Sequence, residues 1–586
     1  MPLVTWNLKD LLPELGSKDY KNLLNDLEKN IVFVESFKGS LQPTFSLSDF
    51  MKILKTKEHI SLLLSRLVDY AYLWFSQDTS HQGAKSYRAT VEQLAVDAGN
   101  RLMFFSLWFK TLDEKNAQRI IQEIDPEYRY YLEFLRLTLK HTLTELEEKV
   151  INLKDVTGTN ALIKVYDVVT NNFVFDLTLN GKKKKLTRSE LTTYVKDSQA
   201  KVRKDAYVSL YKVYGAQADL LHEVYRNLVL DWKNESLTLR KYSSPISPRN
   251  LGNGISDKSV DVLIEVCRKN RTLFQDYFKL KAKLCTIKKM QRYDIYAAYR
   301  EKKKKYTYEQ AKTLVFDAYK AFSPKIFTLA KKIDESKHVD FVLRKNKMSG
   351  AYCMDVGPGI TPYVLLNFNG DIRDVFTIAH EFGHGVHDLL TADHSPLTAH
   401  PPLVLAETAS IFGEMLLFDK LLKEIKDTDL KKSLLINKLD DTYATICRQI
   451  YFILFEIEAH DLVAKGAGLD ELNKAYLLNL KEQFGDSVFI NDEFKYEWLS
   501  IPHIYHTPFY CYSYAFGNLL VLALYEQYKK EGTSFVEKYL KILSYGGSEA
   551  PDKILKEVGI DLEDPHFWQK GFDLVKEMLE ELRDLK

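Results

Sequence analysis

The chain has 586 residues, 45% apolar and 28% charged, and its 82 lysines and arginines against 80 acidic residues give a formal charge of +2. This balance is typical of a folded globular protein and excludes long disordered stretches. A dedicated nucleic-acid binder carries a clear basic excess, so we expect no nucleic-acid partner. No run of 18 or more apolar residues occurs, so we expect no membrane span.

The N-terminal part of the chain has helical patterns. Ser46-x-x-Asp49 forms a capping-box pattern at the start of an apolar-periodic stretch that runs to about residue 76. Asp125-Pro126 marks a break between the last two of the helices that follow. We expect these helices over residues 86–112, 114–124 and 126–150.

A β-hairpin interrupts the helices. Apolar and polar residues alternate over 173–179, Asn180-Gly181 follows, and Lys182–Lys185 begin the return strand. Thr187-x-x-Glu190 then caps a helical region over about 190–236. We place a domain boundary near residue 187. The predicted domains are an N-terminal helical domain over 1–187, ending in the hairpin, and a larger domain over 188–586.

The rest of the chain is also mostly helical, apart from an extended region over 350–368. Its core, Tyr363–Phe368, is short, apolar and rich in β-formers. The stretch from Tyr510 to Tyr525 is apolar but interrupted by Ser, Gly and Asn, and it predicts a buried helix. We therefore predict a mainly α fold with a small β-sheet.

Five cysteines are scattered along the chain without a C-x-x-C pair, and their odd number does not suit a disulfide framework. We interpret them as reduced thiols of a cytoplasmic protein. The first ten residues lack a basic region followed by an apolar stretch, so no secretory signal is evident. The sequence shows no obligate protein partner.

Residues 380–384 read H-E-F-G-H, an H-E-x-x-H motif. On a helix, residues four apart are offset by about 40°, so His380 and His384 point the same way and can bind one zinc ion, with Glu381 beside the open side of the metal. Asp371 suits the N-cap of such a helix. Gly383 costs about 1 kcal/mol inside a helix, which indicates that a ligand or another backbone comes close.

Zinc needs a third protein ligand, and several residues after His384 are candidates. Glu407 is the first Glu after the motif, and Glu414 lies seven residues further, within a helical pattern over about 402–425. Seven residues separate side chains on one helix face by about 20°. One carboxylate can therefore bind the metal while the other accepts the N–H of an imidazole. The weaker candidates are His387, Asp393, His394 and His400.

Spacing excludes two H-E-x-x-H classes. The long metzincin motif requires Gly at position 387 and His at 390, where this chain has His387 and Leu390. A thermolysin-like site has a Glu about 20 residues after the second His, where this chain has Val404.

At these positions the chain resembles the oligoendopeptidase F family of thimet-oligopeptidase-like zinc peptidases. The resemblance covers most of the chain and is most specific between residues 350 and 520. The similar segments are H-E-F-G-H at 380–384, E-T-A-S at 407–410, G-A-Y-C at 350–353, P-Y-V-L-L-N-F at 362–368, H-I-Y-H-T-P-F-Y at 503–510, G-G-S at 546–548 and G-I-D-L at 559–562.

The resemblance implies a two-lobed helical molecule with a deep central channel, a small sheet next to the metal and one zinc ion per chain. It implies His380, His384 and Glu407 as ligands and Glu381 as the catalytic base. By analogy the strand around 350–354 pairs with the substrate backbone. The expected substrate contacts are Gly350, Ala351, Tyr352, His506, Tyr512 and Tyr514.

Histidines and tyrosines are dense over residues 503–514. Neutral Tyr O–H and His N–H groups can stabilise the oxyanion that forms during peptide hydrolysis, and the family uses a His and Tyr cluster from this region in that role. We expect His503 and Tyr510 to fill it here. The resulting hypothesis is a zinc endopeptidase for oligopeptides. Its rivals are a carboxypeptidase on a similar scaffold and a catalytically silent peptide-binding protein, although an intact Glu381 disfavours the latter.

Overall fold

The computed structural model describes residues 6–299 and 304–585. Its contacts divide the chain into two compact units, each assembled from three segments. Unit 1 comprises Met1–Leu139, Lys303–Glu424 and Gln527–Asp561, and unit 2 comprises Lys140–Lys302, Ile425–Glu526 and Leu562–Lys586. Residue 187 falls within unit 2, and the division into domains over 1–187 and 188–586 stays a prediction.

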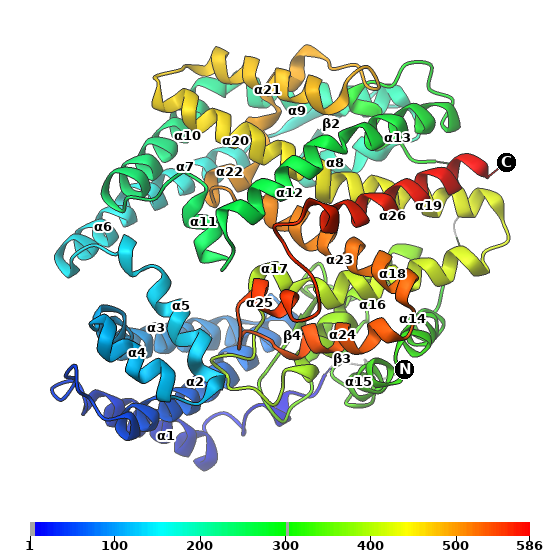
Figure 1. The fold of residues 1–586 in the computed structure, drawn as a ribbon. Helices are drawn as coiled ribbons and strands as arrows, with labels where there is room; N and C mark the ends of the chain where they lie inside the picture. Colours follow the sequence, from blue (N-terminus) through cyan, green and yellow to red (C-terminus); the bar gives the residue numbers. More distant parts are fainter. Residues whose placement is uncertain (1–5, 300–303, 586) are drawn as a thin grey trace. The chain divides into compact units, whose positions relative to one another are not determined.

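The first segment of unit 1 is a group of helices with its own apolar core (Figure 1). The predicted start at Ser46 is confirmed, because its hydroxyl accepts the N–H of Asp49 at 3.0 Å. Phe50 packs against Phe105 and Phe109, with ring centroids 5.1 and 5.5 Å apart. The helices are α1 (Lys18–Glu35), α2 (Leu47–Gln77), α3 (Gln82–Thr111), α4 (Glu114–Glu123) and α5 (Arg129–Leu137).

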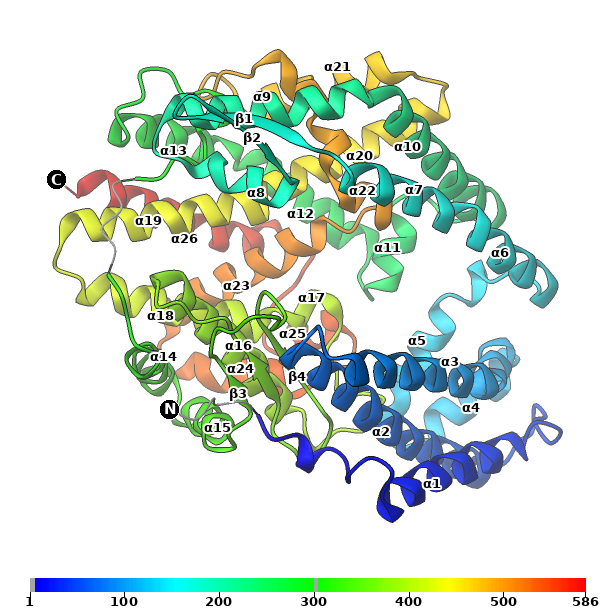
Figure 2. The same ribbon diagram turned by 180° about the vertical axis from the view of Figure 1, so that it is seen from behind.

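The middle segment of unit 1 packs three helices around the predicted metal motif. α16 (Ile372–Leu390) holds the motif and lies against α18 (Thr408–Glu424) and α14 (Tyr308–Phe322), as Figures 1 and 2 both show. The remaining helices of unit 1 are α15 (Pro324–Glu335), α17 (Leu403–Ala406), α24 (Ser534–Ser544) and α25 (Pro551–Lys556).

A small sheet packs against α16 in the strand order β3-β5-β4. β5 (Tyr363–Leu365) pairs in parallel with β3 (Val339–Asp340) and antiparallel with β4 (Tyr352–Met354), with Cys353 opposite Val364. A buried ion pair braces the connection from β3 to β4, since the Lys347 ammonium donates to Asp340 Oδ1 at 2.8 Å and to the carbonyl of Leu366 at 2.6 Å.

Unit 2 begins with two helices and the predicted hairpin. β1 (Phe175–Leu179) pairs antiparallel with β2 (Lys182–Leu186), whose four lysines are exposed. The helices of unit 2 are α6 (Glu145–Thr157), α7 (Thr159–Asn171), α8 (Arg188–Thr193), α9 (Ala200–Ala216), α10 (Ala218–Trp232), α11 (Ser247–Gly252), α12 (Asp257–Lys269), α13 (Arg271–Leu284), α19 (Thr428–Thr442), α20 (Arg448–Ala464), α21 (Leu469–Phe484), α22 (Pro502–His506), α23 (Tyr512–Glu531, its last five residues assigned to unit 1) and α26 (Pro565–Asp584).

Three long helices predicted from the sequence are interrupted. The prediction of one helix over 126–150 is wrong, because α5 ends at Leu137 and Thr144 starts α6 with a capping box of its own. The helix over 190–236 is broken where Asp197 Oδ1 accepts the N–H of Gln199 at 2.8 Å, a local bond that competes with helix continuation. The helix over 402–425 is interrupted at Glu407, between α17 and α18.

The prediction of a mainly α fold with a small sheet beside the H-E-x-x-H helix is confirmed. The predicted buried helix near Tyr510–Tyr525 is present as α23. The deep channel implied by the family resemblance stays a prediction.

Candidate metal centre

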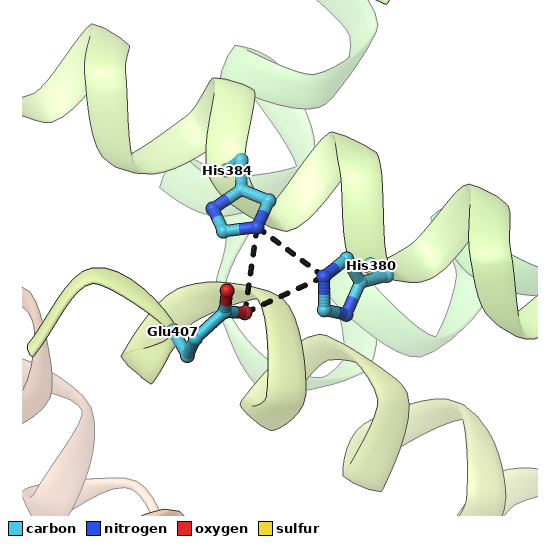
Figure 3. Close-up of side chains that lie close together, drawn as sticks. All are labelled: His380, His384 and Glu407. Atoms are coloured by element: carbon cyan, nitrogen blue, oxygen red, sulfur yellow. Dashed lines mark hydrogen bonds and ion pairs between the residues drawn. The ribbon is translucent and has the colours of Figure 1, made fainter. Parts of the chain in front are cut away.

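The two histidines of the motif lie on successive turns of α16 and face the same side (Figure 3). The helix begins as predicted at Asp371, whose N–H donates to Asp374 Oδ2 at 3.1 Å. His380 Nε2 and His384 Nε2 are 3.3 Å apart. The sequence spacing therefore directs both imidazoles to one point.

Glu407 completes a triangle of ligand atoms. Its Oε2 lies 3.4 Å from His380 Nε2 and 3.5 Å from His384 Nε2 (Figure 3). In a tetrahedral zinc site, bonds of about 2.05 Å place neighbouring ligand atoms about 3.3 Å apart. The triangle matches one face of such a tetrahedron, so these three donors fit a zinc ion and leave its fourth position for water or substrate.

Glu414, on α18, orients one of the imidazoles. Its Oε1 lies 2.6 Å from His380 Nδ1. When the carboxylate accepts a hydrogen bond from Nδ1 of this ring, the other nitrogen, Nε2, is the one available to a metal. The sequence predicts one metal-binding and one supporting carboxylate. The distances suit Glu407 to the first role and Glu414 to the second, and both roles stay predictions.

The charges around the histidines also suit a cation. Burial lowers the pKa of His380, but the hydrogen bond and charge of Glu414, with the charges of Glu407 and Glu381, raise it to about 9. Burial raises the pKa of Glu407, but the hydrogen bond and charge of His384, with His380, lower it to about 2. Burial raises the pKa of Glu381 above its usual range. Three carboxylates around two imidazoles thus attract positive charge.

Glycines let α16 and α18 approach closely enough to bring the ligands together. A Cβ on Gly383 would sit 2.6 Å from Ser410 Cα and 2.7 Å from the carbonyl oxygen of Ala409. Gly413 faces α16 in the same way, since a Cβ there would lie 3.0 Å from the carbonyl oxygen of Ala379. The sequence indicates that a ligand or another backbone comes close to Gly383, and in the structure it is the backbone of α18 at Ser410 and the residue before it, Ala409.

Tyr319, on α14, joins both helices and was not found from the sequence. Its hydroxyl donates to the carbonyl of Ala379 at 2.5 Å, one residue before the first ligand. The same hydroxyl lies 2.5 Å from where a Cβ on Gly413 would sit. Sixty residues separate the hydrogen-bonded pair, so only the tertiary structure reveals this contact.

The alternative histidine ligands lie elsewhere. His387 is buried on α16, and burial lowers its pKa to about 4. His394 lies 2.9 Å from Glu127 through Nδ1 and 2.6 Å from the carbonyl of Ser544 through Nε2. His400 Nδ1 lies 3.9 Å from Asp355 Oδ2. Among the described residues, none of the three joins the ligand triangle.

The predicted substrate strand forms the edge strand β4, with Gly350 and Ala351 directly before it. The carbonyl of Gly350 accepts from Asn367 Nδ2 at 2.7 Å. The Tyr352 ring packs near Tyr72 and Trp6, at centroid distances of 5.5 and 6.4 Å. β4 also contacts α16, because a Cβ on Gly385 would lie 3.3 Å from Cys353 Sγ.

The histidine and tyrosine cluster belongs to unit 2 and forms a compact aromatic group there. The Tyr514 hydroxyl lies 3.3 Å from His503 Nε2. The Tyr510 ring is parallel to His503, with centroids 6.1 Å apart, and perpendicular to Tyr514 at 5.3 Å. Burial, and then the charge of His506, lower the pKa of His503, which favours the neutral form of its ring.

Two other members of this segment have partners of their own within unit 2. Tyr512 is fully buried, and its hydroxyl accepts from Asn253 Nδ2 at 2.8 Å. His506 Nε2 lies 2.7 Å from Asp167 Oδ1. The structure therefore groups Tyr514, not these two residues, with His503 and Tyr510.

A second set of acidic side chains, Asp155, Asp231 and Glu235, has oxygen atoms close enough for one cation. Glu235 already accepts from Arg240 Nε at 2.7 Å, and Asp231 accepts from Thr159 at 2.5 Å. These bonds explain the cluster as part of the surface packing of α6, α7 and α10.

Comparisons with known proteins agree with this geometry. Residues 193–574, more than half of the chain, match the model of peptidase family M3, and residues 108–175 match the Oligopeptidase F model. The chain belongs to peptidase family M3, a family of metal-dependent oligopeptidases. The resemblance to oligoendopeptidase F seen in the sequence is thereby confirmed.

Relatives match over nearly the whole chain. Oligopeptidase PepF of Bacillus subtilis is 28% identical over 600 residues, covering 99% of this chain and 87% of PepF. An oligoendopeptidase F homolog of Borreliella burgdorferi is 27% identical, covering 99% of this chain and 98% of its own. A Chlamydophila abortus crystal structure has a TM-score of 0.90 at 26% identity, covering 100% of this chain and 99% of that chain.

A crystal structure of oligoendopeptidase-F from Enterococcus faecium shares the fold. Its TM-score is 0.71 at 22% identity, and the match covers 96% of this chain and 98% of that one. Within residues 6–299 and 304–585, no helix has both the length and the apolar character needed to cross a membrane.

Proposed function

We propose that this M3 peptidase is a zinc-dependent endopeptidase that hydrolyses internal bonds of short oligopeptides. The triangle of His380, His384 and Glu407 carries this proposal, because its three sides of 3.3, 3.4 and 3.5 Å suit one zinc ion with an open position. Glu414 supports the site by holding the proton on His380 Nδ1.

A zinc ion held by these residues supplies Lewis acidity, which polarises a peptide carbonyl and lowers the pKa of water. Glu381, the residue after the first ligand, acts as the general base in this proposal. Water adds to the carbonyl carbon, the C–N bond breaks, and the proton that the Glu381 carboxylate takes from water passes to the leaving amine nitrogen.

The aromatic group of unit 2 supplies neutral hydrogen-bond donors for the carbonyl oxygen as it becomes negative. We assign this role to His503 and Tyr510 and add Tyr514, whose hydroxyl contacts His503. The edge strand β4 and the preceding Gly350 and Ala351 are the proposed backbone contacts of an extended peptide.

Short peptides are the proposed substrates because the relatives with more than 95% coverage on both sides are named oligoendopeptidases. The cytoplasm stays the proposed location, on the basis of the scattered cysteines. Fractionation of cells that produce the protein tests that location.

The decisive experiment compares Glu381→Gln with wild type on a peptide blocked at both ends. We expect Glu381→Gln to retain zinc and melting temperature while losing about 10²–10⁴-fold in kcat, the usual contribution of a general base. Arg373→Gln is the matched control, since Arg373 is exposed on the first turn of the same helix.

The products also distinguish the rival functions. Cleavage of the blocked peptide only after its C-terminus is freed would indicate a carboxypeptidase. Zinc retention without cleavage of any peptide by wild type would indicate a peptide-binding protein. Near-full activity of zinc-loaded Glu381→Gln would remove Glu381 from its role as the base.

A further inference from the structure

The loop that leads into Tyr510 contains an unusual backbone conformation. Phe509 has φ = +58°, a left-handed conformation that costs an L-residue about 1–2 kcal/mol. Such conformations persist only where the surrounding structure imposes them, and they gather at functional sites. The next residue along the chain is Tyr510, so the backbone conformation at Phe509 determines the position and direction of the Tyr510 side chain.

The peptide group between Pro508 and Phe509 is held at both of its polar ends. The N–H of Phe509 donates to Glu456 Oε1 at 2.9 Å, and the carbonyl of Pro508 accepts from Arg249 Nε at 3.2 Å. These two bonds fix the plane of one peptide group. They therefore restrain the ψ angle of Pro508 and the φ angle of Phe509 together.

The two holding residues come from helices that lie outside the loop. Glu456 is in the middle of α20, and Arg249 is on α11. The Phe509 ring is fully buried, with centroids 4.7 Å from His460, one turn further along α20, and 6.5 Å from Trp232. The loop is thus attached to the helical body of unit 2 by its backbone and by its side chain.

Packing alone does not account for Glu456. Its side chain is fully buried, and among the described residues its Oε2 has no hydrogen-bond partner. A buried polar atom left without a partner costs about 1–3 kcal/mol. Burial raises the pKa of Glu456 to about 8, although the Phe509 N–H and Arg249 oppose this shift. A leucine would fill this position at lower cost if only volume mattered.

We propose that Glu456 and Arg249 are positioning residues that hold the Pro508–Phe509 peptide so that Tyr510 takes its place beside His503 and Tyr514. They touch no substrate and act through Tyr510. This inference rests on the proposed function, which assigns Tyr510 to the oxyanion.

The test uses two variants of the full-length zinc enzyme and a matched control. Glu456→Leu removes the acceptor, whereas Glu456→Gln keeps an amide oxygen for the Phe509 N–H. Asn479→Leu is the control, because buried Asn479 donates to the carbonyl of Tyr451 at 3.0 Å, a contact to α20 that does not involve the Pro508–Phe509 peptide.

We expect Glu456→Leu to lower kcat on a blocked peptide by about 10–100-fold, less than the 10²–10³-fold typical of removing an oxyanion donor outright. KM and zinc content should change less than twofold. Glu456→Gln should restore kcat to within threefold of wild type, and Asn479→Leu should leave kcat unchanged even where it lowers the melting temperature. Equal kcat losses for the leucine variants would overturn the inference.

A double-mutant cycle shows whether Glu456 acts through Tyr510. In a Tyr510→Phe background, Glu456→Leu should cost less than threefold. Suppose that Tyr510→Phe lowers kcat and that adding Glu456→Leu lowers it again by the full factor seen in wild type. This result overturns the positioning role of Glu456 but leaves Tyr510 in the proposed function. An unchanged kcat for Tyr510→Phe removes Tyr510 from the proposed function, and the positioning role with it.

If Glu456→Leu does not fold, Arg249→Met provides the same test. It keeps most of the side-chain volume but releases the carbonyl of Pro508. We expect a kcat loss that disappears in the Tyr510→Phe background, and a loss that persists there would overturn the inference.

Discussion

Replacing Gly383 with alanine should weaken zinc binding, although Gly383 is not itself one of the proposed metal-binding residues. The added Cβ would lie 2.6 Å from Ser410 Cα, whereas ordinary contacts begin at 3.4 Å, so α16 and α18 must separate by about 0.8 Å. Ligand distances in metal sites tolerate changes of only about 0.2 Å. His380 and His384 would therefore move out of reach of a zinc ion held by Glu407.

The size of the effect follows from the cost of overpacking. Pulling the helices back together costs about 1–3 kcal/mol, and zinc must supply this energy on binding. At 1.4 kcal/mol per tenfold change, the zinc Kd should rise by about 5–150-fold. Alanine also favours helices more than glycine does, by up to about 1 kcal/mol. This preference changes the free energy of folding, not the ratio of the zinc Kd values of variant and wild type.

Chelator competition measures the zinc Kd of Gly383→Ala and of a control on the same helix, Gly385→Ala. A Cβ on Gly385 would also meet an atom at 2.6 Å, but that atom is Cδ1 of Ile333, the end of a flexible side chain. Ile333 belongs to α15, so an adjustment there leaves the spacing of α16 and α18 unchanged, and we expect the control to bind zinc within twofold of wild type. An unchanged Kd for Gly383→Ala, or an equal rise in both variants, would refute the reasoning.

Three further predictions concern the ligands, the pH dependence of stability and substrate length. Glu407→Ala should weaken zinc binding far more than Glu414→Ala, for which a loss of about 10–100-fold is typical of a supporting residue; a titration with the opposite order would exchange their roles. Burial raises the pKa of Glu127, but bonds from His394, Thr398 and Ser395 lower it below 4.5, and Glu127 raises the pKa of His394 above 6.5. The carboxylate contributes stability that is lost as pH falls below 4.5, and the imidazolium contributes stability that is lost as pH rises above 6.5. The difference in Tm between wild type and His394→Gln should therefore be largest near pH ~5.5 and shrink on both sides, and a difference that grows above pH 7 would contradict this pairing. Peptides of up to roughly 20 residues, about 70 Å when extended, should be cleaved internally, whereas the same sequence attached as a tail to a folded domain should be spared; equal turnover would indicate a general endoprotease.

The local parts of this protein could be predicted from sequence because their signals lie within one or two helical turns. The spacing of His380 and His384 defines a helix face, and Asp371 marks where that helix begins. Gly383 indicates a close approach before the approaching backbone is known. The hairpin at Asn180-Gly181 follows from turn chemistry in the same way.

The remaining features depend on contacts between distant segments. Periodicity continues across Glu407, so the break that lets this residue reach the histidines is visible only in the structure. Tyr319 and Glu456 act on backbone groups far away in sequence, and their local sequence resembles ordinary helix interior. The left-handed conformation of Phe509 carries no sequence signal, because glycine usually marks that region.

The interleaving of the two units has a consequence for how the protein is made. The proposed metal ligands and the supporting Glu414 are all present once residues 380–414 have been synthesised, but unit 1 also includes Gln527–Asp561 and unit 2 includes Leu562–Lys586. At about 5–20 residues per second, ribosomes expose the early segments for tens of seconds before either unit can close. During that interval the apolar surfaces of α16 and α18 are not yet covered by later helices such as α24. We therefore expect newly made chains to bind chaperones until synthesis is nearly complete, and early zinc loading to be reversible.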